Sequence, residues 1–268
     1  MNRGGITQTS AKGIFNTALK PRSFQVAGVD GCKAGWLVAV VSAMKVSTTA
    51  NIACIYKLQK FLVAPTFSEI VSRKTQLELI CADIPIGLSD GDKPRECDLA
   101  ARRLLRGPRA SSVFPAPVRT CLSAKDYKTA SEICFEYSGK KLNRQSFALL
   151  EKIRQVDDIM TAELPYRVRE IHPEVSFWAL NGKKPVEQNK KTVPGQAHRH
   201  KLLERIFADM DDILSKSPRS GFAMDDAFDA LAAAWTAGQT VLGRFRTLPE
   251  KPEIDGKGLR MEILCPAC

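Results

Sequence analysis

The stretch VAGVDGCKAGWLVAV, residues 26–40, decides the fold of this chain. An apolar run ends in the acid Asp30, passes through the glycine-containing segment GCKAG and becomes apolar again. Two apolar runs joined by a short turn predict a pair of antiparallel strands. Because a carboxylate is costly to bury without a compensating charge, Asp30 has two interpretations. It is either a turn residue or a side chain that holds something positive.

The apolar pattern continues on the C-terminal side of this hairpin. Residues 51–58, NIACIYKL, alternate well enough to predict a third strand, which favours an antiparallel meander. Residues 66–74, TFSEIVSRK, begin with a capping-box pattern and predict a helix. The run LELICADIPIGL, residues 77–88, then predicts a fourth strand that ends at Asp83 and lies parallel to one of the earlier strands.

Helical patterns dominate the rest of the chain. Residues 143–162 are amphipathic and begin at a favourable N-cap residue, Asn143. Residues 166–182 predict a short strand followed by a helix. The alanine-rich residues 222–243 predict a long helix, and the last residues of the chain predict a terminal strand.

These patterns predict a single domain. A flexible basic tail is expected at residues 1–23, followed by one domain over residues 24–268. Its inserted helices are expected at about 89–165 and 173–221. The fold class is therefore α/β, with helices flanking a mixed sheet.

The composition favours a polyanionic partner such as nucleic acid. The net charge is +11 and the pI is about 9.3, and basic surface gains affinity for polyanions through counterion release, although a merely soluble basic protein has the same charge. No run of about 18 apolar residues occurs, so we expect no membrane partner. The eight cysteines are irregularly spaced, which predicts free thiols in a reducing, cytoplasmic compartment. The close pair Cys265 and Cys268 lacks a second pair, so we expect no metal site there.

Acidic residues stand at the ends of several predicted elements. Asp30 ends the first strand, Asp83 ends the fourth, and Glu174 follows a later strand. Asp225, Asp226 and Asp229 occupy the first turns of the alanine-rich helix, where Asp229 can share one face with either Asp225 or Asp226. Taken singly, each acid is explained as a turn, cap or first-turn residue.

Taken together, these acids predict a cation site. The carboxyl ends of neighbouring parallel strands open onto one crevice, so Asp30 and Asp83 meet if their strands pair. Clustered carboxylates do not all stay ionised without a cation. Hard oxygen ligands suit Mg²⁺ or Mn²⁺, and a pair of such ions serves in-line displacement at phosphorus.

Eight motifs carry a family resemblance, in this chain order: GVDGCKAGW, ADIPIGL, RECDLAAR, SVFPAPVR, EIHPEVSFWALNG, NKKT, DDAFDALAAAWTA and GLRMEI. From about residue 25 to 264, the chain resembles the DUF429 family, whose members are described as predicted nucleases with a ribonuclease H-like fold. The resemblance implies a five-stranded mixed sheet whose first three strands are antiparallel. It also implies flanking helices and a helical insertion after the fourth strand.

The resemblance further implies a site. In ribonuclease H-like nucleases, the metal-binding acids come from the first strand, the fourth strand and the last helix. Asp30, Asp83, Asp226 and Asp229 stand at the matching positions. The run DDAFDAL also looks like the last-helix run of Holliday-junction resolvases of this fold. Glu174 has no firm counterpart in that set, and we add it as a further catalytic candidate.

The motifs SVFPAPVR and HPEVSFW are not general nuclease features and suggest a more particular substrate. Arg109, Arg119, Lys190 and Lys191 are candidates for binding its phosphates. For Arg109 and Arg119 an equally weighted alternative stands, in which they pair with acids and pin a long loop.

The sequence thus predicts a metal-dependent nuclease or phosphodiesterase that uses Mg²⁺ or Mn²⁺ and acts on nucleic acid. One alternative is a nucleotide-binding protein of the actin and sugar-kinase type, which shares this core and cradles phosphate in an Asp-x-Gly hairpin like VDGCKAG. A chain of 268 residues without a second such hairpin is short for that class. The other alternative is a non-catalytic nucleic-acid-binding protein, whose binding would not depend on Asp30 or Asp83.

Overall fold

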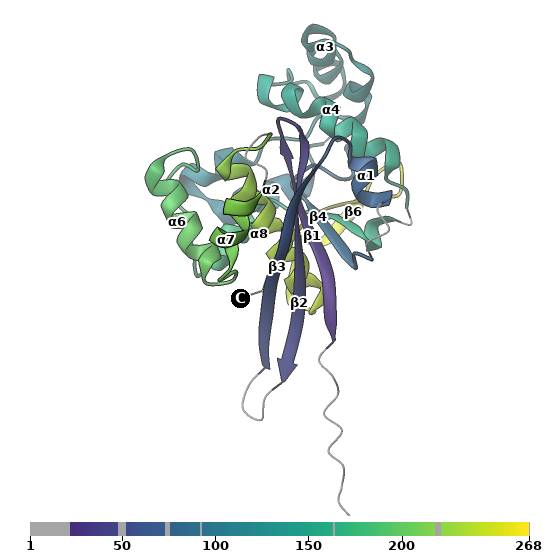
Figure 1. The fold of residues 1–268 in the computed structure, drawn as a ribbon. Coiled ribbons are helices and arrows are strands. Elements are labelled where there is room, and N and C mark those ends of the chain that lie inside the picture. The colour runs from purple at the N-terminus through teal and green to yellow at the C-terminus, as the bar shows by residue number, and fades with distance from the viewer. Residues whose placement is uncertain are drawn as a thin grey trace, which may run out of the picture.

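The computed structural model describes residues 22–47, 52–72, 76–91, 93–162, 164–217 and 221–267. Most of the expected tail, residues 1–21, and Cys268 of the C-terminal cysteine pair lie outside these ranges. Helices lie on both sides of a central sheet, so the chain is an α/β protein (Figure 1). None of the helices in the described ranges has the length and apolar character needed to cross a membrane.

The central sheet has five strands in the order β3-β2-β1-β4-β5. β1 pairs antiparallel with β2, β2 pairs antiparallel with β3, and β4 lies parallel to both β1 and β5. The sheet is therefore mixed and its first three strands are antiparallel, as the sequence predicts. The bounds are β1 (Ser23–Cys32), β2 (Gly35–Ser47), β3 (Ile52–Ala64), β4 (Leu79–Ala82) and β5 (Val168–Glu170).

The long helix α8 (Met224–Val241) covers one face of the sheet and packs directly on β1. Gly28 of β1 makes this close approach possible. A Cβ atom at Gly28 would lie 2.0 Å from Ala230 O and 2.1 Å from Ala234 N. The backbones of strand and helix therefore touch, which brings the first turns of α8 to the carboxyl end of β1.

The other helices complete a layer on each face of the sheet. The side chains of α1 and α4 pack on the face opposite α8, and those of α5, α6 and α7 join the core around α8. α4 begins as predicted, because Asn143 Oδ1 accepts a hydrogen bond from Ser146 N at 2.7 Å. The sequence does not predict α3 and α7. The bounds are α1 (Phe67–Ser72), α2 (Glu96–Leu105), α3 (Tyr127–Ser138), α4 (Arg144–Ile159), α5 (Pro173–Leu180), α6 (Val193–Glu204) and α7 (Met210–Lys216), with 3-10 turns η1 (Gly107–Ser112), η2 (Arg119–Ser123) and η3 (Leu164–Tyr166).

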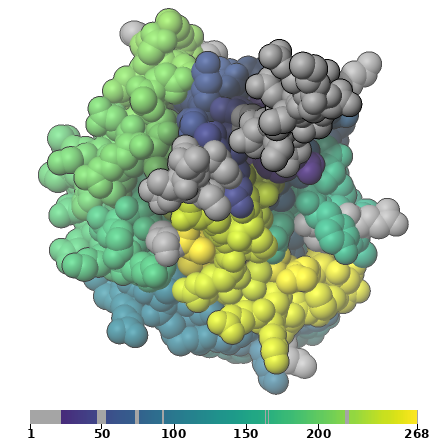
Figure 2. Space-filling model, turned by 90° about the horizontal axis from the view of Figure 1, so that it is seen from below, coloured from purple at the N-terminus to yellow at the C-terminus, as the bar shows by residue number. Residues whose placement is uncertain are grey.

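The C-terminal segment forms a second, two-stranded sheet from β6 (Phe245–Ile254) and β7 (Arg260–Pro266). The terminal strand is predicted, but β6 is not, because the two prolines in FRTLPEKPEI are typical of a loop. The strand accommodates them where its pairing with β7 is irregular. Figure 2 shows this yellow segment beside the yellow-green α8 on the face seen from below. A bridge between Ile171 and Leu264 joins β7 to the end of β5.

A buried arginine fixes the chain that leaves β4. Arg95 binds Glu170 of β5 at 2.7 Å and Asp98 of α2 at 2.6 Å. The other oxygen of Glu170 accepts a hydrogen bond from Ile86 N at 2.7 Å. The segment that follows Asp83 is therefore held from both sides, which limits where Asp83 can lie.

Candidate functional site

Asp30 and Asp83 stand at neighbouring strand ends, as the sequence predicts. Asp30 lies near the carboxyl end of β1, opposite Leu37 of β2, and only 7 % of its surface is exposed. Asp83 directly follows β4, and its N–H donates to Val29 O of β1 at 2.9 Å, which extends the parallel pairing. Asp83 is half-buried. The two acids therefore reach the same edge of the sheet.

The first turns of α8 add a third acid. Asp229 is 1 % exposed, and its charge acts on Asp30. Asp226 is half-buried, and its Oδ2 accepts a hydrogen bond from Ala223 N at 2.8 Å, which caps the start of α8. Of the two α8 acids predicted as metal ligands, Asp229 thus lies among the buried acids, whereas Asp226 lies at their margin and serves the helix end. We call Asp30, Asp83 and Asp229 the acid group.

Burial raises the pKa of every carboxyl in the acid group, and the charges of neighbouring acids add to the rise. Burial raises the pKa of Asp30 well above its ordinary value, and the charges of Asp229 and Asp83 raise it further. Burial raises the pKa of Asp229 to about 7, with Lys190 opposing the rise and Asp83 adding to it. Burial also raises the pKa of Asp83, while His172 and Lys190 oppose the rise. The group therefore carries more negative charge than a buried site tolerates unaided, which favours a nearby cation.

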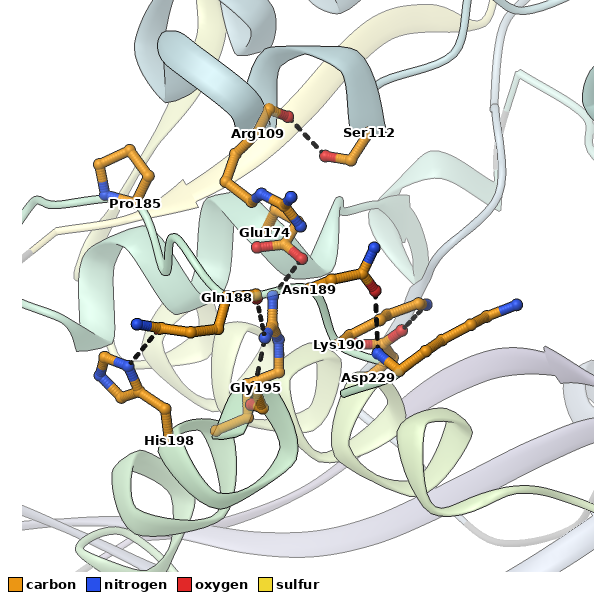
Figure 3. A network of polar contacts seen from close by, with 12 residues as sticks. Arg109, Ser112, Glu174, Pro185, Gln188, Asn189, Lys190, Gly195, His198 and Asp229 are labelled. Atoms are coloured by element: carbon orange, nitrogen blue, oxygen red, sulfur yellow. Dashed lines mark hydrogen bonds and ion pairs between the residues drawn. The ribbon is translucent and has the colours of Figure 1, made fainter. Parts of the chain in front are cut away.

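Lys190 supplies one such positive charge from the protein itself. Its Nζ lies 2.5 Å from Asp229 Oδ2, and the two side chains point toward one another (Figure 3). The charges of Asp229, Asp83 and Asp30 all raise the pKa of Lys190, so it stays protonated. Lys190 is a predicted phosphate contact, and the structure places it in an ion pair with the acid group. Lys191, the other predicted lysine, is exposed.

The NKKT motif forms a tight turn that directs Lys190. Asn189 Oδ1 accepts a hydrogen bond from Lys191 N at 2.9 Å, and Asn189 O accepts one from Thr192 Oγ1 at 2.8 Å. Thr192 Oγ1 in turn caps α6 by accepting from Gly195 N at 3.3 Å. A Cβ atom at Gly195 would lie 1.9 Å from Asn189 O, so the turn closes directly onto the helix.

Glu174 lies beside the acid group in a buried ion pair. Its Oε1 is 2.5 Å from Arg199 Nη2, and the charge of Glu174 raises the pKa of both Asp83 and Asp229. Only 5 % of Glu174 and 1 % of Arg199 are exposed. Glu174 Oε2 has no hydrogen-bond partner among the described residues. Glu174 is a predicted site residue, and the structure places it near the others with one carboxylate oxygen unused.

The sequence patterns do not single out two further residues, Arg199 and His172, that contact the candidate site residue Glu174. Arg199 also donates to Gln188 O at 3.0 Å, so it ties Glu174 to the loop that carries Lys190. Its place on the buried face of α6, one turn before Leu202 and Leu203, is the signal that could have identified it. His172 accepts from Glu174 N through Nδ1 at 3.2 Å and donates from Nε2 to Ser112 O at 3.3 Å. His172 therefore links the SVFPAPVR region to the acid group, and its position just before Pro173 at a helix start was the available signal.

The two predicted arginines have different environments. Arg109 is half-buried, its side chain points toward Glu174 in Figure 3, and its guanidinium makes no hydrogen bond or ion pair within the described ranges. Arg119 binds Asp157 and Asp255, two acids outside the acid group. Arg119 thus matches the loop-pinning alternative, whereas Arg109 retains donors for a ligand.

Arg119→Met is expected to lower the free energy of unfolding by about 1–3 kcal/mol. Asp157 and Asp255 lose a shared cation, but Asp255 keeps its hydrogen bonds from backbone N–H groups. Urea unfolding at neutral pH measures the loss. Arg103→Met is the matched control, because within the described ranges Arg103 pairs only with Glu96, on the exposed side of α2, and it should cost less than about 0.5 kcal/mol. Equal stability of the two variants would contradict the pinning role.

The acid group suits a hard divalent cation in its chemistry, because carboxylate oxygens are the ligands that Mg²⁺ and Mn²⁺ prefer. It is not a preformed metal centre, however. In the part of the chain that the structure describes, no three His, Cys, Asp or Glu side chains form a group placed to hold one ion. The ammonium group of Lys190 instead lies against Asp229. A divalent cation would have to share Asp229 with Lys190.

Fold and site together define an α/β protein with a mixed five-stranded sheet and a buried acid group beside the carboxyl ends of two adjacent parallel strands. The chain belongs to the DUF429 family, described as a protein of unknown function, whose model matches residues 28–254. This range contains the whole acid group, together with Glu174 and Lys190. The resemblance found in the sequence motifs is thereby confirmed. No curated protein and no solved structure matches the chain.

Proposed function

We propose that the protein is a metal-dependent phosphodiesterase that acts on nucleic acid, and that its sheet is of the ribonuclease H-like type. The observation that carries the proposal is the convergence of Asp30, Asp83 and Asp229 from β1, the end of β4 and α8. Clustered carboxylates whose pKa values are raised by burial and by neighbouring acids are unfavourable for stability unless a cation balances their charge. The order of the strands, with three antiparallel and two parallel, supports the proposed fold type.

In this proposal, Asp30, Asp83 and Asp229 would hold Mg²⁺ or Mn²⁺. When bound, such an ion supplies positive charge to a phosphate oxygen and acidifies a water. The unused Oε2 of Glu174 accepts a hydrogen bond from a substrate or water hydroxyl, and Arg199 keeps that carboxylate in place. Arg109 donates to a phosphate oxygen, since its guanidinium makes no bond within the described ranges.

Two wider properties support a nucleic-acid substrate in the cytoplasm. The net charge of +11 favours a polyanion. Within the described ranges Cys32, Cys54, Cys81, Cys97, Cys121 and Cys134 are free thiols, which suits a reducing compartment.

The test is cleavage of a panel of single-stranded and duplex DNA, RNA, an RNA–DNA hybrid and a four-way junction. Each is incubated with MnCl₂, MgCl₂ or EDTA, and products are resolved on denaturing gels. We expect cleavage that needs the metal and is lost in Asp83→Asn. Asp90→Asn is the matched control, because Asp90 is an exposed acid seven residues further along, and it should retain activity. A parent protein inactive on every substrate, or an Asp83→Asn variant as active as the parent, would overturn the proposal.

A further inference from the structure

We propose that the protein binds single-stranded nucleic acid and seats one unpaired base of the strand in a cavity between α6, α7 and the start of α8. We call this space the base cavity. The inference rests on the nucleic-acid substrate of the proposed function and narrows its class. It uses a part of the molecule that lies outside the acid group.

The base cavity has the size and walls of a ligand site. Its volume is about 670 Å³, within the range of about 300–1,000 Å³ that is typical of small-molecule sites. Apolar side chains from three segments line it, among them Val193 of α6, Phe222 and Met224 of α8. Val193 is 81 % exposed and Met224 is 47 % exposed, so large apolar groups face solvent at this cavity. Apolar side chains gathered at an open cavity indicate a binding site.

The polar side chains of the base cavity favour a base over a phosphate. His200 Nε2 and Asp211 Oδ1 are 2.8 Å apart, and the His200 ring packs edge-on against Phe228, with the ring centres 6.0 Å apart. The carboxylate of Asp211 repels a phosphate, whereas the amino group of a base can donate a hydrogen bond to a carboxylate. The flat apolar faces of a base suit the apolar walls.

A row of basic side chains on the adjoining side of α6 suits the backbone of the same strand. His198, Lys201 and Arg205 are three and four residues apart, so they share one side of the helix, and they line a second cavity of about 420 Å³. Lys201 and Arg205 are exposed and form no ion pair within the described ranges. Ala197 lines both cavities, so the basic row and the base cavity are neighbours. Phosphates that lie along the basic row therefore keep the bases within reach of the base cavity.

The base cavity and the acid group share two helices. Val193 begins α6 shortly after Lys190, whose Nζ lies 2.5 Å from Asp229 Oδ2. Met224 begins α8, five residues before Asp229. Figure 1 shows α6 and α7 on the same side of the sheet as α8. A base seated in the cavity therefore sets which phosphate of the strand lies closest to the acid group.

This arrangement favours a single strand over a duplex. The bases of a duplex are paired and stacked, and one of them enters a cavity only after it has left the stack, at a cost in free energy. A base of a single strand is already unpaired. The single strand should therefore bind more tightly, although a duplex offers more phosphates to the basic row.

Fluorescence anisotropy in EDTA tests the inference without metal and without cleavage. The probes are fluorescein-labelled single strands of about 12 nucleotides, one DNA and one RNA, and the DNA duplex of the same sequence. We expect the parent to bind the single strands at least about 10-fold more tightly than the duplex.

Ser215→Trp fills the base cavity from an exposed position on α7 and should weaken single-strand binding by about 10-fold. Ser123→Trp is the matched control, because Ser123 is an exposed serine of η2 that lines neither cavity, and it should bind as the parent does.

Salt dependence tests the basic row separately. Lys201→Met should reduce the slope of log affinity against log salt concentration by about 0.7, the value of one phosphate contact on a single strand. Ser215→Trp should keep the parental slope, because it removes no charge. Lys128→Met is the control for net charge, because Lys128 is an exposed lysine of α3 that lines neither cavity, and it should also keep the parental slope.

Three outcomes would overturn the inference and leave the phosphodiesterase proposal to be decided by cleavage. They are equal affinity for single strand and duplex, parental affinity in a Ser215→Trp variant with a native circular dichroism spectrum, and a parental salt slope in Lys201→Met. Tight single-strand binding by a protein that cleaves nothing would support the base cavity and overturn only the phosphodiesterase proposal. The comparison of single strand and duplex uses the parent, so it decides even if Ser215→Trp does not fold.

Discussion

Asp30→Asn is expected to reduce metal-dependent cleavage by about 10³-fold or more, which corresponds to about 4 kcal/mol of transition-state stabilisation. At the same time it should raise the melting temperature of the metal-free protein. Asp30 is 7 % exposed, and its charge faces those of Asp83 and Asp229. An asparagine has nearly the same shape and removes one of the repelling charges. A side chain that lowers the free energy of unfolding of its own protein is expected at a functional site, where activity is retained at a cost in stability.

The gain in stability should depend on pH. In the folded protein the pKa of Asp30 is raised above its ordinary value of 3.8, so ionisation of this carboxyl opposes folding. Below about pH 4 the carboxyl is protonated in both folded and unfolded chains, and parent and variant should melt together. From about pH 4 up to the folded pKa of Asp30, the variant should become progressively the more stable, because the unfolded parent ionises in this range and the folded parent does not. Above the folded pKa the difference should stay constant, with each kcal/mol worth about 2–4 °C.

Differential scanning calorimetry in EDTA between pH 4 and pH 8 measures this difference. Asp90→Asn, at an exposed acid, should melt with the parent at every pH. If Asp30→Asn instead loses activity and stability together, Asp30 is a structural turn residue and the cation site is wrong. Adding MnCl₂ should reduce the difference in melting temperature between parent and variant, because a bound cation stabilises only the folded parent.

Gly28→Ala is expected to be the most destabilising single change in the sheet, at more than about 4 kcal/mol. The added Cβ atom would lie 2.0 Å from Ala230 O and 2.1 Å from Ala234 N, and both are backbone atoms of α8. No side-chain rotation relieves such a contact, so the helix must move away from β1. That movement also carries Asp229 away from Asp30, so any folded variant should bind Mn²⁺ more weakly.

Gly31→Ala, in the same strand, provides the control. Its added Cβ atom would meet the side chain of Lys152 at 2.8 Å, and a flexible side chain can move aside. We expect a loss of less than about 1 kcal/mol there. Chemical denaturation followed by circular dichroism compares the two variants. A Gly28→Ala protein as stable as Gly31→Ala would show that α8 does not pack on β1 in the way described.

Much of the fold follows from local patterns. The hairpin around GCKAG, the third and fourth strands and the long α8 are encoded by apolar spacing and glycine turns, and all are found. β6 is missed because its two prolines are typical of loops, and a strand can accept them only where no ladder hydrogen bond from their backbone nitrogen is needed. Whether a strand position needs that hydrogen bond depends on the partner strand, and the local sequence does not show it.

The sequence also predicts that acids stand at the ends of elements, because each acid follows an apolar run that must end in a turn. Asp30 and Asp83 are found together for this reason. The sequence does not predict that Asp226 and Asp229 have different environments. Both lie in the first turns of one helix, and only the orientation of α8 on β1 places Asp229 inside and leaves Asp226 at the helix cap.

The sequence alone determined the order of the strands along the chain, the long helix and the set of acids at their ends, since these depend on residues a few positions apart. Tertiary structure alone decided the partners of the charged side chains. Lys190 meets Asp229 from 39 residues away, and Arg119 meets Asp255 from 136 residues away. A charged side chain in an interior of low polarity takes whatever opposite charge the packing brings within reach. The pairing of Arg119 with structural acids, and of Lys190 with the acid group, therefore appeared only once the helices and strands were packed together.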